Sequence, residues 1–102
     1  MKWRMYANQR ADGWIHNIFL NRKSVEICYM PDPIIAIDVT EDPNGKWWGW
    51  VRTDSYENNG IPSMIHEDIR LVDMCFPYGM KEAEKAGDGH RIQLHVEVVA
   101  VG

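Results

Sequence analysis

Alternation of apolar and polar residues is the feature that most restricts the fold of this chain. It runs through three segments, Val25–Tyr29, Ile35–Val39 and Ile92–Val98. Side chains of a β-strand point alternately to opposite faces, so the pattern predicts strands with one buried and one solvated face. A fourth strand is expected over Trp14–Leu20, which is apolar on both faces. We therefore predict a mainly β protein, at the margin of the α+β class, built on an antiparallel sheet.

Composition limits the other classes of protein. The chain has 102 residues, 45% of them hydrophobic, and a formal net charge of -4. This length suits one domain, and no repeat or linker divides residues 1–102. No apolar run is long enough to span a membrane, and no apolar stretch follows Met1-Lys2-Trp3-Arg4, so we expect no secretory signal and a cytoplasmic location. The acidic balance disfavours nucleic-acid binding.

Turn residues mark where the strands end. Asp42-Pro43-Asn44-Gly45 has proline where its fixed φ starts a type I turn and glycine where a positive φ is expected. This turn predicts a hairpin that leads into a strand over residues 46–52. Pro31-Asp32-Pro33 is expected to break the chain before the next strand, because proline lacks a backbone donor. The polar segment 53–62 is expected to be a loop.

One helix is expected, over residues 78–86, which contain good helix formers. Gly87 follows as a left-handed cap, and Met80 and Ala83 are expected to face the sheet. The segment 63–73 fits both a helical stripe and a strand, so its periodicity alone decides nothing.

Residues 14–73 resemble a Src-homology-three barrel in the order and spacing of their motifs. The segment Glu26–Ile35 is similar to the family's ELSFKKGDII pattern, and Trp47-Trp48 matches its paired tryptophans. Residues 60–63 resemble the glycine-to-proline approach to the family's single helical turn, and Ile69–Val72 resembles its last strand.

The resemblance implies a small antiparallel barrel over residues 14–73, in which 63–73 form a short helical turn followed by a strand. Residues 74–102 would then be an extension made of one helix and a long final strand. The apolar face of that strand is too large to leave in water. We expect it either to extend the same sheet or to pair with a second copy of the chain in a homodimer.

The family binds proline-rich peptides in a groove lined by its first tryptophan, a proline and several tyrosines. Trp47 and Pro62 match that groove, whereas His16 and Ile65 stand where tyrosines are expected. Flat aromatic rings are what a polyproline helix packs against, so ordinary recognition of such peptides is not expected.

Three tryptophans fall within four positions of one expected strand. Trp48 and Trp50 share a face and are expected to pack under the C-terminal extension, which leaves Trp47 as the exposed ring.

We predict a non-enzymatic binding or interaction module that recognises a protein segment or a small planar ligand on an aromatic surface. No cofactor and no metal are expected, because no pair of histidines has the spacing of metal ligands. The expected ligand-binding residues are Trp47, Tyr56, Pro62, Ile65 and His16.

Two other functions are consistent with the sequence. A small enzyme could use Cys75 as a nucleophile with His66 or His90 as its base, because a helix is expected just after this thiol. The second function is that of an acidic accessory or inhibitor protein that acts on a larger host complex. An enzyme is disfavoured, since the sequence has neither a glycine-rich phosphate loop nor a serine elbow. Cys28 and Cys75 are expected to be reduced.

Overall fold

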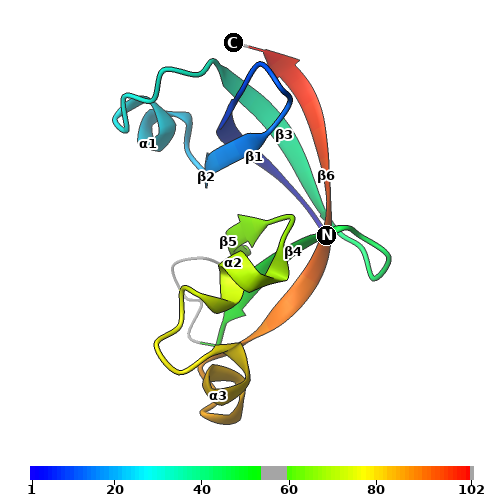
Figure 1. The fold of residues 1–102 in the computed structure, drawn as a ribbon. Helices are drawn as coiled ribbons and strands as arrows, with labels where there is room; N and C mark the ends of the chain where they lie inside the picture. The colour runs from blue at the N-terminus through cyan, green and yellow to red at the C-terminus, as the bar shows by residue number, and fades with distance from the viewer. Residues whose placement is uncertain (54–59, 102) are drawn as a thin grey trace. The chain divides into compact units, whose positions relative to one another are not determined.

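The described part of the chain, residues 1–53 and 60–101 of a computed structural model, contains six strands and three short helices (Figure 1). The strands form one antiparallel sheet in the order β2-β1-β3-β6-β4-β5, which confirms a mainly β fold. Residues 1–40 form one compact unit with the end of the chain from Val96, and residues 41–95 form a second unit. The elements are β1 Lys2–Gln9, β2 Ile15–Phe19, α1 Arg22–Glu26, β3 Ile34–Glu41, β4 Trp47–Arg52, β5 Ser63–His66, α2 Ile69–Asp73, α3 Met80–Lys85 and β6 Gly89–Val101.

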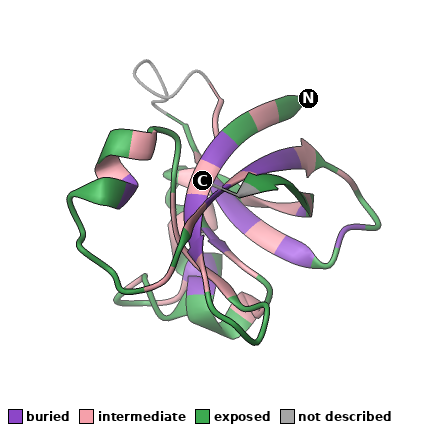
Figure 2. Cartoon of the chain, turned by 90° about the horizontal axis from the view of Figure 1, so that it is seen from above, coloured by how far each residue is buried: buried purple, intermediate pink, exposed green. Residues whose placement is uncertain are grey.

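The core of the first unit comes from strand alternation. In the register of β1 with β3, Met5 lies opposite Ile37 and Ala7 lies opposite Ile35. All four side chains are buried, and Figure 2 shows buried stretches along the strands of the sheet. Cross-strand pairs of this kind are the units that stabilise a sheet. The predicted strand over residues 35–39 is confirmed, and β1 adds an inner strand that lies outside the range of the family resemblance.

The prediction of a strand over Val25–Tyr29 is wrong. Helix α1 occupies the start of this segment, where Arg22 and Glu26 form an i,i+4 ion pair at 3.0 Å. Val25 is buried, whereas Ile27 and Tyr29 are exposed. A strand would have needed a neighbour to cover all three apolar side chains, and a single helical turn needs to bury only one. The similarity of this segment to the family's strand therefore has no counterpart in the fold.

The turn at Asp42–Gly45 forms, but it does not close a hairpin. The Gly45 N–H donates to the Asp42 carbonyl oxygen at 2.9 Å, as in a β-turn. Strand β6 lies between β3 and β4, so the two strands that the turn joins are not neighbours. Gly45 does not have a positive φ. A Cβ atom there would lie 2.1 Å from the Leu94 carbonyl oxygen, so close approach to β6 is what requires glycine.

Replacing Gly45 with alanine is expected to lower the free energy of unfolding by about 2 kcal/mol or more, because the new methyl group meets backbone that cannot rotate away. Urea denaturation measures the change. Asn44→Ala, at the exposed neighbouring position of the same turn, is the control and should change stability by less than about 0.5 kcal/mol. Equal effects of the two substitutions would contradict the close approach.

The core of the second unit forms where β4 meets helices α2 and α3. Trp50, Val72 and Met80 are buried together, and Trp48, Ile69, Phe76 and Ala83 pack against them. The Trp50 and Phe76 ring centroids lie 4.6 Å apart. The expected packing of Trp48 and Trp50 under the C-terminal extension is thus confirmed, as is the inward position of Met80 and Ala83.

The helices are short, and each buries one residue. Helices α1 and α2 have five residues and α3 has six; their buried residues are Val25, Val72 and Met80. The predicted helix is confirmed as α3, with Gly87 at a φ of +78° after it, but the expectation of a single helix is wrong. None of the helices in the described residues has the length and apolarity needed to cross a membrane.

Segment 63–73 folds in the reverse of the predicted order, with strand β5 first and helix α2 second. Asp68 explains why the helix starts where it does, because its side chain accepts the Arg70 backbone N–H at 2.9 Å. Ile69 and Val72, three residues apart, then pack on the same core. The helical stripe therefore prevails over the alternation, and Ile69–Val72 is not a barrel strand.

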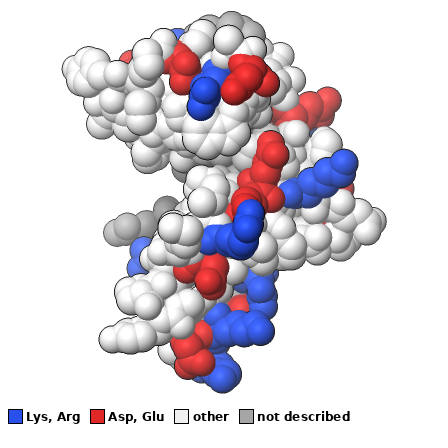
Figure 3. Space-filling view, viewed as in Figure 1, with Lys and Arg blue, Asp and Glu red and all other residues white. Residues whose placement is uncertain are grey.

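Acidic and basic side chains lie interspersed on the face shown in Figure 3. Among the described residues, the most buried charged side chain is that of Asp38 on β3, which lies opposite Arg4 of β1. Asp38 Oδ1 accepts from Arg4 Nε at 2.7 Å, and Asp38 Oδ2 lies 3.2 Å from Lys2 Nζ. The hydrogen bond from Arg4, with help from Lys2, lowers the pKa of Asp38 below its ordinary value.

Asp38→Asn is expected to lower the free energy of unfolding at neutral pH. It should also make that free energy less sensitive to low pH. An unfolded aspartate titrates near pH 4, and the folded-state pKa of Asp38 is lower. Its contribution to stability is therefore complete above about pH 4 and is lost as the pH falls through the folded-state pKa. Urea denaturation at several pH values should show the difference between wild type and Asp38→Asn shrinking below about pH 4. Glu97→Gln, at an exposed carboxylate, is the control; a difference that stays constant with pH would contradict the ion pair.

Candidate functional site

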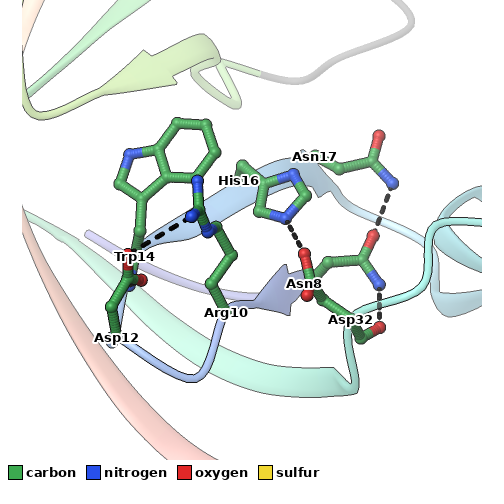
Figure 4. A network of polar contacts seen from close by, with 7 residues as sticks. All are labelled: Asn8, Arg10, Asp12, Trp14, His16, Asn17 and Asp32. Atoms are coloured by element: carbon green, nitrogen blue, oxygen red, sulfur yellow. Dashed lines mark hydrogen bonds and ion pairs between the residues drawn. The ribbon is translucent and has the colours of Figure 1, made fainter.

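A polar network lies where β1 and β2 meet, in the first unit (Figure 4). Asn8 of β1 lies opposite His16 of β2 in the strand register. The register shifts here, because Tyr6 lies opposite Phe19 and Asn8 lies opposite His16, so β2 has one extra residue over this stretch. Such irregularities redirect side chains at the ends of strands. The hairpin therefore brings side chains from two strands to one place.

The turn between β1 and β2 fixes the position of Trp14. Gly13 has a φ of +94°, and its N–H donates to the Arg10 carbonyl oxygen at 2.9 Å. Asp12 Oδ1 accepts the Trp14 backbone N–H at 3.0 Å. Arg10 Nη2 lies 3.6 Å from Asp12 Oδ2. These bonds hold the backbone on both sides of the tryptophan, as Asx-turns do.

The Trp14 ring is ordered by its neighbours without being buried. It stacks on the His16 ring, with centroids 4.7 Å apart and planes inclined by 10°. The Arg10 guanidinium carbon lies 5.7 Å from the Trp14 ring centroid, within the range of a cation–π contact. Even so, 44% of Trp14 is exposed. We call Arg10, Trp14 and His16 the Trp14 surface.

Asp32 holds the His16 ring from the other side. His16 Nε2 lies 2.8 Å from Asp32 Oδ2. Asp32 stands between Pro31 and Pro33, whose fixed φ angles limit the movement of this segment. The backbone is also tied to β1, because the Gln9 N–H donates to the Pro33 carbonyl oxygen at 3.0 Å. The carboxylate that orients the imidazole is therefore itself held in place.

The Asn8 side chain links two other members of the network, Asp32 and Asn17. Asn8 is only 1% exposed. Its Nδ2 donates to the Asp32 carbonyl oxygen at 2.8 Å. Its Oδ1 accepts from Asn17 Nδ2 at 2.7 Å. Asn17 has a φ of +56°, a left-handed conformation that asparagine tolerates better than most residues. A buried amide with both ends bonded makes such a network rigid.

A histidine oriented by a carboxylate can act as a base or as a positioned binding group. The described contacts of His16 are with Trp14 and Asp32, and no nucleophile is among them. Over residues 1–53 and 60–101, no group of three or more His, Cys, Asp or Glu side chains is arranged to hold a metal ion. Asp32 therefore fixes the orientation of the His16 ring that stacks on Trp14.

The residues predicted to bind a ligand do not come together at one site. Trp47 is only 9% exposed, and Pro62 and Ile65 are also buried, so these three lie in the core of the second unit. Tyr56 lies outside the described residues. His16 belongs to the first unit and takes part in the Trp14 surface. Of the five, His16 alone among the described residues lies at a partly open site.

Trp47 is buried, and it lies on an inner strand of the sheet, β4. This strand pairs with β6 on one edge and β5 on the other. Trp47 lies opposite Leu94, and a Cβ atom at Gly49 would lie 2.9 Å from Leu94 Cδ1. The face that was expected to be open is therefore filled, and the expectation that Trp47 is the exposed ring is wrong.

Sequence reasoning missed Trp14, Asn8 and Asp32 as parts of a site. A signal for the first was present, since Trp14 and His16 are two residues apart and share a strand face. The proline pair around Asp32 also indicated a rigid segment. Nothing in the sequence indicated that Asn8 would be buried.

Comparison with known proteins assigns the chain to no family. No family model matches the chain, and neither a curated protein nor a solved structure does. The six antiparallel strands are compatible with the strand content of a Src-homology-three-like barrel. The chemistry of the Trp14 surface therefore has to be judged from its own geometry.

Asn8→Ala is expected to lower the free energy of unfolding by about 1–3 kcal/mol, because it removes a buried amide and leaves the half-buried partners of its two hydrogen bonds unsatisfied. Urea denaturation is the measurement. Gln9→Ala is the control, because the Gln9 side chain makes one exposed hydrogen bond, to the Gly13 carbonyl oxygen. This substitution should change the free energy of unfolding by less than about 0.5 kcal/mol. A neutral Asn8→Ala would contradict the supporting role of this amide.

Proposed function

We propose that the protein is a non-enzymatic binding module that recognises a protein segment on the Trp14 surface. The observation that carries this proposal is an aromatic ring that is 44% exposed and yet stacked on His16. Large exposed rings are usual anchors of binding, and rings already ordered lose little entropy when a partner arrives. The proposal keeps the predicted class of function and moves the site from Trp47 to Trp14.

A protein segment suits this surface better than a small planar ligand because of where β2 lies. Strand β2 stands at one end of the strand order of the sheet, next to β1. In the described part of the chain, no strand pairs with its other edge. An outer strand offers backbone donors and acceptors to an extended peptide. The left-handed Asn17 interrupts this edge, so strand pairing would be short and the aromatic surface would supply the remaining contact.

The Trp14 surface also defines what side chains the segment should carry. Trp14 offers an apolar face, and Arg10 offers guanidinium donors, since its 3.6 Å contact with Asp12 is loose. An apolar or aromatic residue next to an acidic one would satisfy both. Because Trp14 stacks on His16, the apolar residue has one defined place to pack.

Selection from a random peptide library displayed on phage tests the proposal. We expect peptides with an apolar and an acidic residue close together, and we expect Trp14→Ala to weaken their binding by at least about tenfold, as loss of an anchor does. Fluorescence polarisation with the selected peptides measures the affinities.

Leu20→Ala is the matched control, because Leu20 is exposed in the same unit but takes no part in the network. It should leave binding unchanged. Selected peptides that bind wild type and Trp14→Ala equally, or that lose affinity equally with both substitutions, would show that the Trp14 surface is not the site.

A further inference from the structure

A second place on the molecule has the properties of a ligand site. In the second unit, a cavity of about 520 Å³ opens between α2 and α3, and Arg91 of β6 also lines it. Pockets for small molecules have volumes of roughly 300–1,000 Å³. We call this the α2–α3 cavity. No residue of the Trp14 surface takes part in it.

A hydrogen bond between the two helices gives the cavity fixed walls. Asp73, the last residue of α2, accepts the Met80 backbone N–H at 2.8 Å. Met80 is the first residue of α3, so a side chain of one helix caps the other. Gly79, at a φ of +87°, makes the turn into α3. The walls are therefore held by a bond to a buried residue, since Met80 belongs to the core.

Two arginines at the cavity are oriented by carboxylates outside it. Arg70 binds Asp68 through Nε and Nη2, with a shortest contact of 2.6 Å from Nη2. Arg91 Nε lies 3.3 Å from Glu84 Oε1. A guanidinium has five N–H donors, so both arginines keep further donors for a ligand. The hydrogen bonds from Arg70 lower the pKa of Asp68 to about 2, and this carboxylate stays ionised at neutral pH.

The lining of the cavity has three basic residues and two acidic ones, and ion pairs with Asp68 and Glu84 offset part of the charge of its arginines. Arg70, Lys81 and Arg91 line it, and Asp73 and Glu82 are the carboxylates that do so. Both carboxylates are engaged elsewhere, Asp73 with the Met80 N–H and Glu82 with Lys85 at 3.4 Å. Figure 3 shows basic and acidic side chains side by side around α3. The groups with donors to spare are therefore the cations, which favours an anion as ligand.

The cavity also has an aromatic and an apolar part. Tyr78 lines it and is 87% exposed, which leaves nearly the whole ring available for contact. Ile69 and Met80 add apolar side chains to the lining, and both also pack in the core of the second unit. A planar body could stack on such a ring while its charged group meets the cations.

We propose that the α2–α3 cavity binds a small organic anion, with a planar body against Tyr78 and a carboxylate or phosphate group held by Arg70 and Arg91. The volume, the positioned arginines and the exposed ring are independent observations that agree on this class of ligand. Carboxylate and phosphate both match the geometry of a guanidinium fork.

Titration followed by proton–nitrogen NMR spectra of the full chain tests the proposal. The probes are benzoate and phenyl phosphate, with benzyl alcohol as the neutral analogue. We expect saturable shifts of backbone signals over residues 69–82 with at least one anion and none with the alcohol. The stronger of the two anions identifies the preferred charged group. Inorganic phosphate should bind more weakly than phenyl phosphate, because it lacks the planar body.

Two substitutions locate the binding. Arg91→Gln and Tyr78→Ala should each weaken the affinity by about tenfold, which is the usual effect of losing a charged hydrogen bond or an aromatic anchor. Arg22→Gln is the matched control, since Arg22 forms a similar ion pair in α1 of the other unit, and it should have no effect. Unchanged spectra of the remaining residues show that each variant is folded; Arg70→Gln, at a side chain that is largely exposed, replaces Arg91→Gln if that variant is not.

Absence of saturable shifts with both anions would overturn the proposal. Equal binding of benzyl alcohol would overturn the role of the arginines. Shifts that persist unchanged in Arg91→Gln and Tyr78→Ala would place the anion elsewhere on the surface and would also overturn it.

Discussion

The close approach of Gly45 to the backbone of Leu94 is the constraint on which the second unit depends. It lets the chain pass β6 immediately after the turn at residues 42–45, so that β6 can lie between β3 and β4. Strand β4 then has a neighbour on each edge, and Trp47 becomes part of the core. Glycine at position 45 is therefore needed for the strand order in which Trp47 packs against β6.

Local patterns in the sequence were sufficient for the elements that depend on local chemistry. The alternation at residues 35–39 and 92–98, the Asp-Pro-Asn-Gly turn and the helix before Gly87 all occur in the structure. Two kinds of prediction failed. Strand order is set by which surfaces meet across long separations, so the turn indicated a hairpin that does not exist. Short apolar segments such as Val25–Tyr29 and Ile69–Val72 fit both periodicities, and burial and capping decided for helix.

The candidate site was predictable only in part, and for a physical reason. His16 was singled out because it stands where the resembled family has a tyrosine, and it does lie beside an exposed ring. That ring is Trp14, whose availability depends on the Asp12-Gly13 turn and on a carboxylate from between two prolines. The supporting amide, Asn8, becomes buried only after three segments have come together. Such networks depend on tertiary packing, which no single stretch of sequence encodes.

The contrast between an ordered, exposed Trp14 and a buried Trp47 can be measured directly by fluorine NMR of protein labelled with 5-fluorotryptophan. Replacement of each of the five tryptophans by phenylalanine in turn assigns the signals. The Trp14 signal should shift on exchange from water to deuterium oxide and move again when a selected peptide is added. The Trp47 and Trp50 signals should do neither. A Trp47 signal that responds to solvent, or peptide-induced shifts that leave Trp14 unaffected, would contradict a binding surface at Trp14.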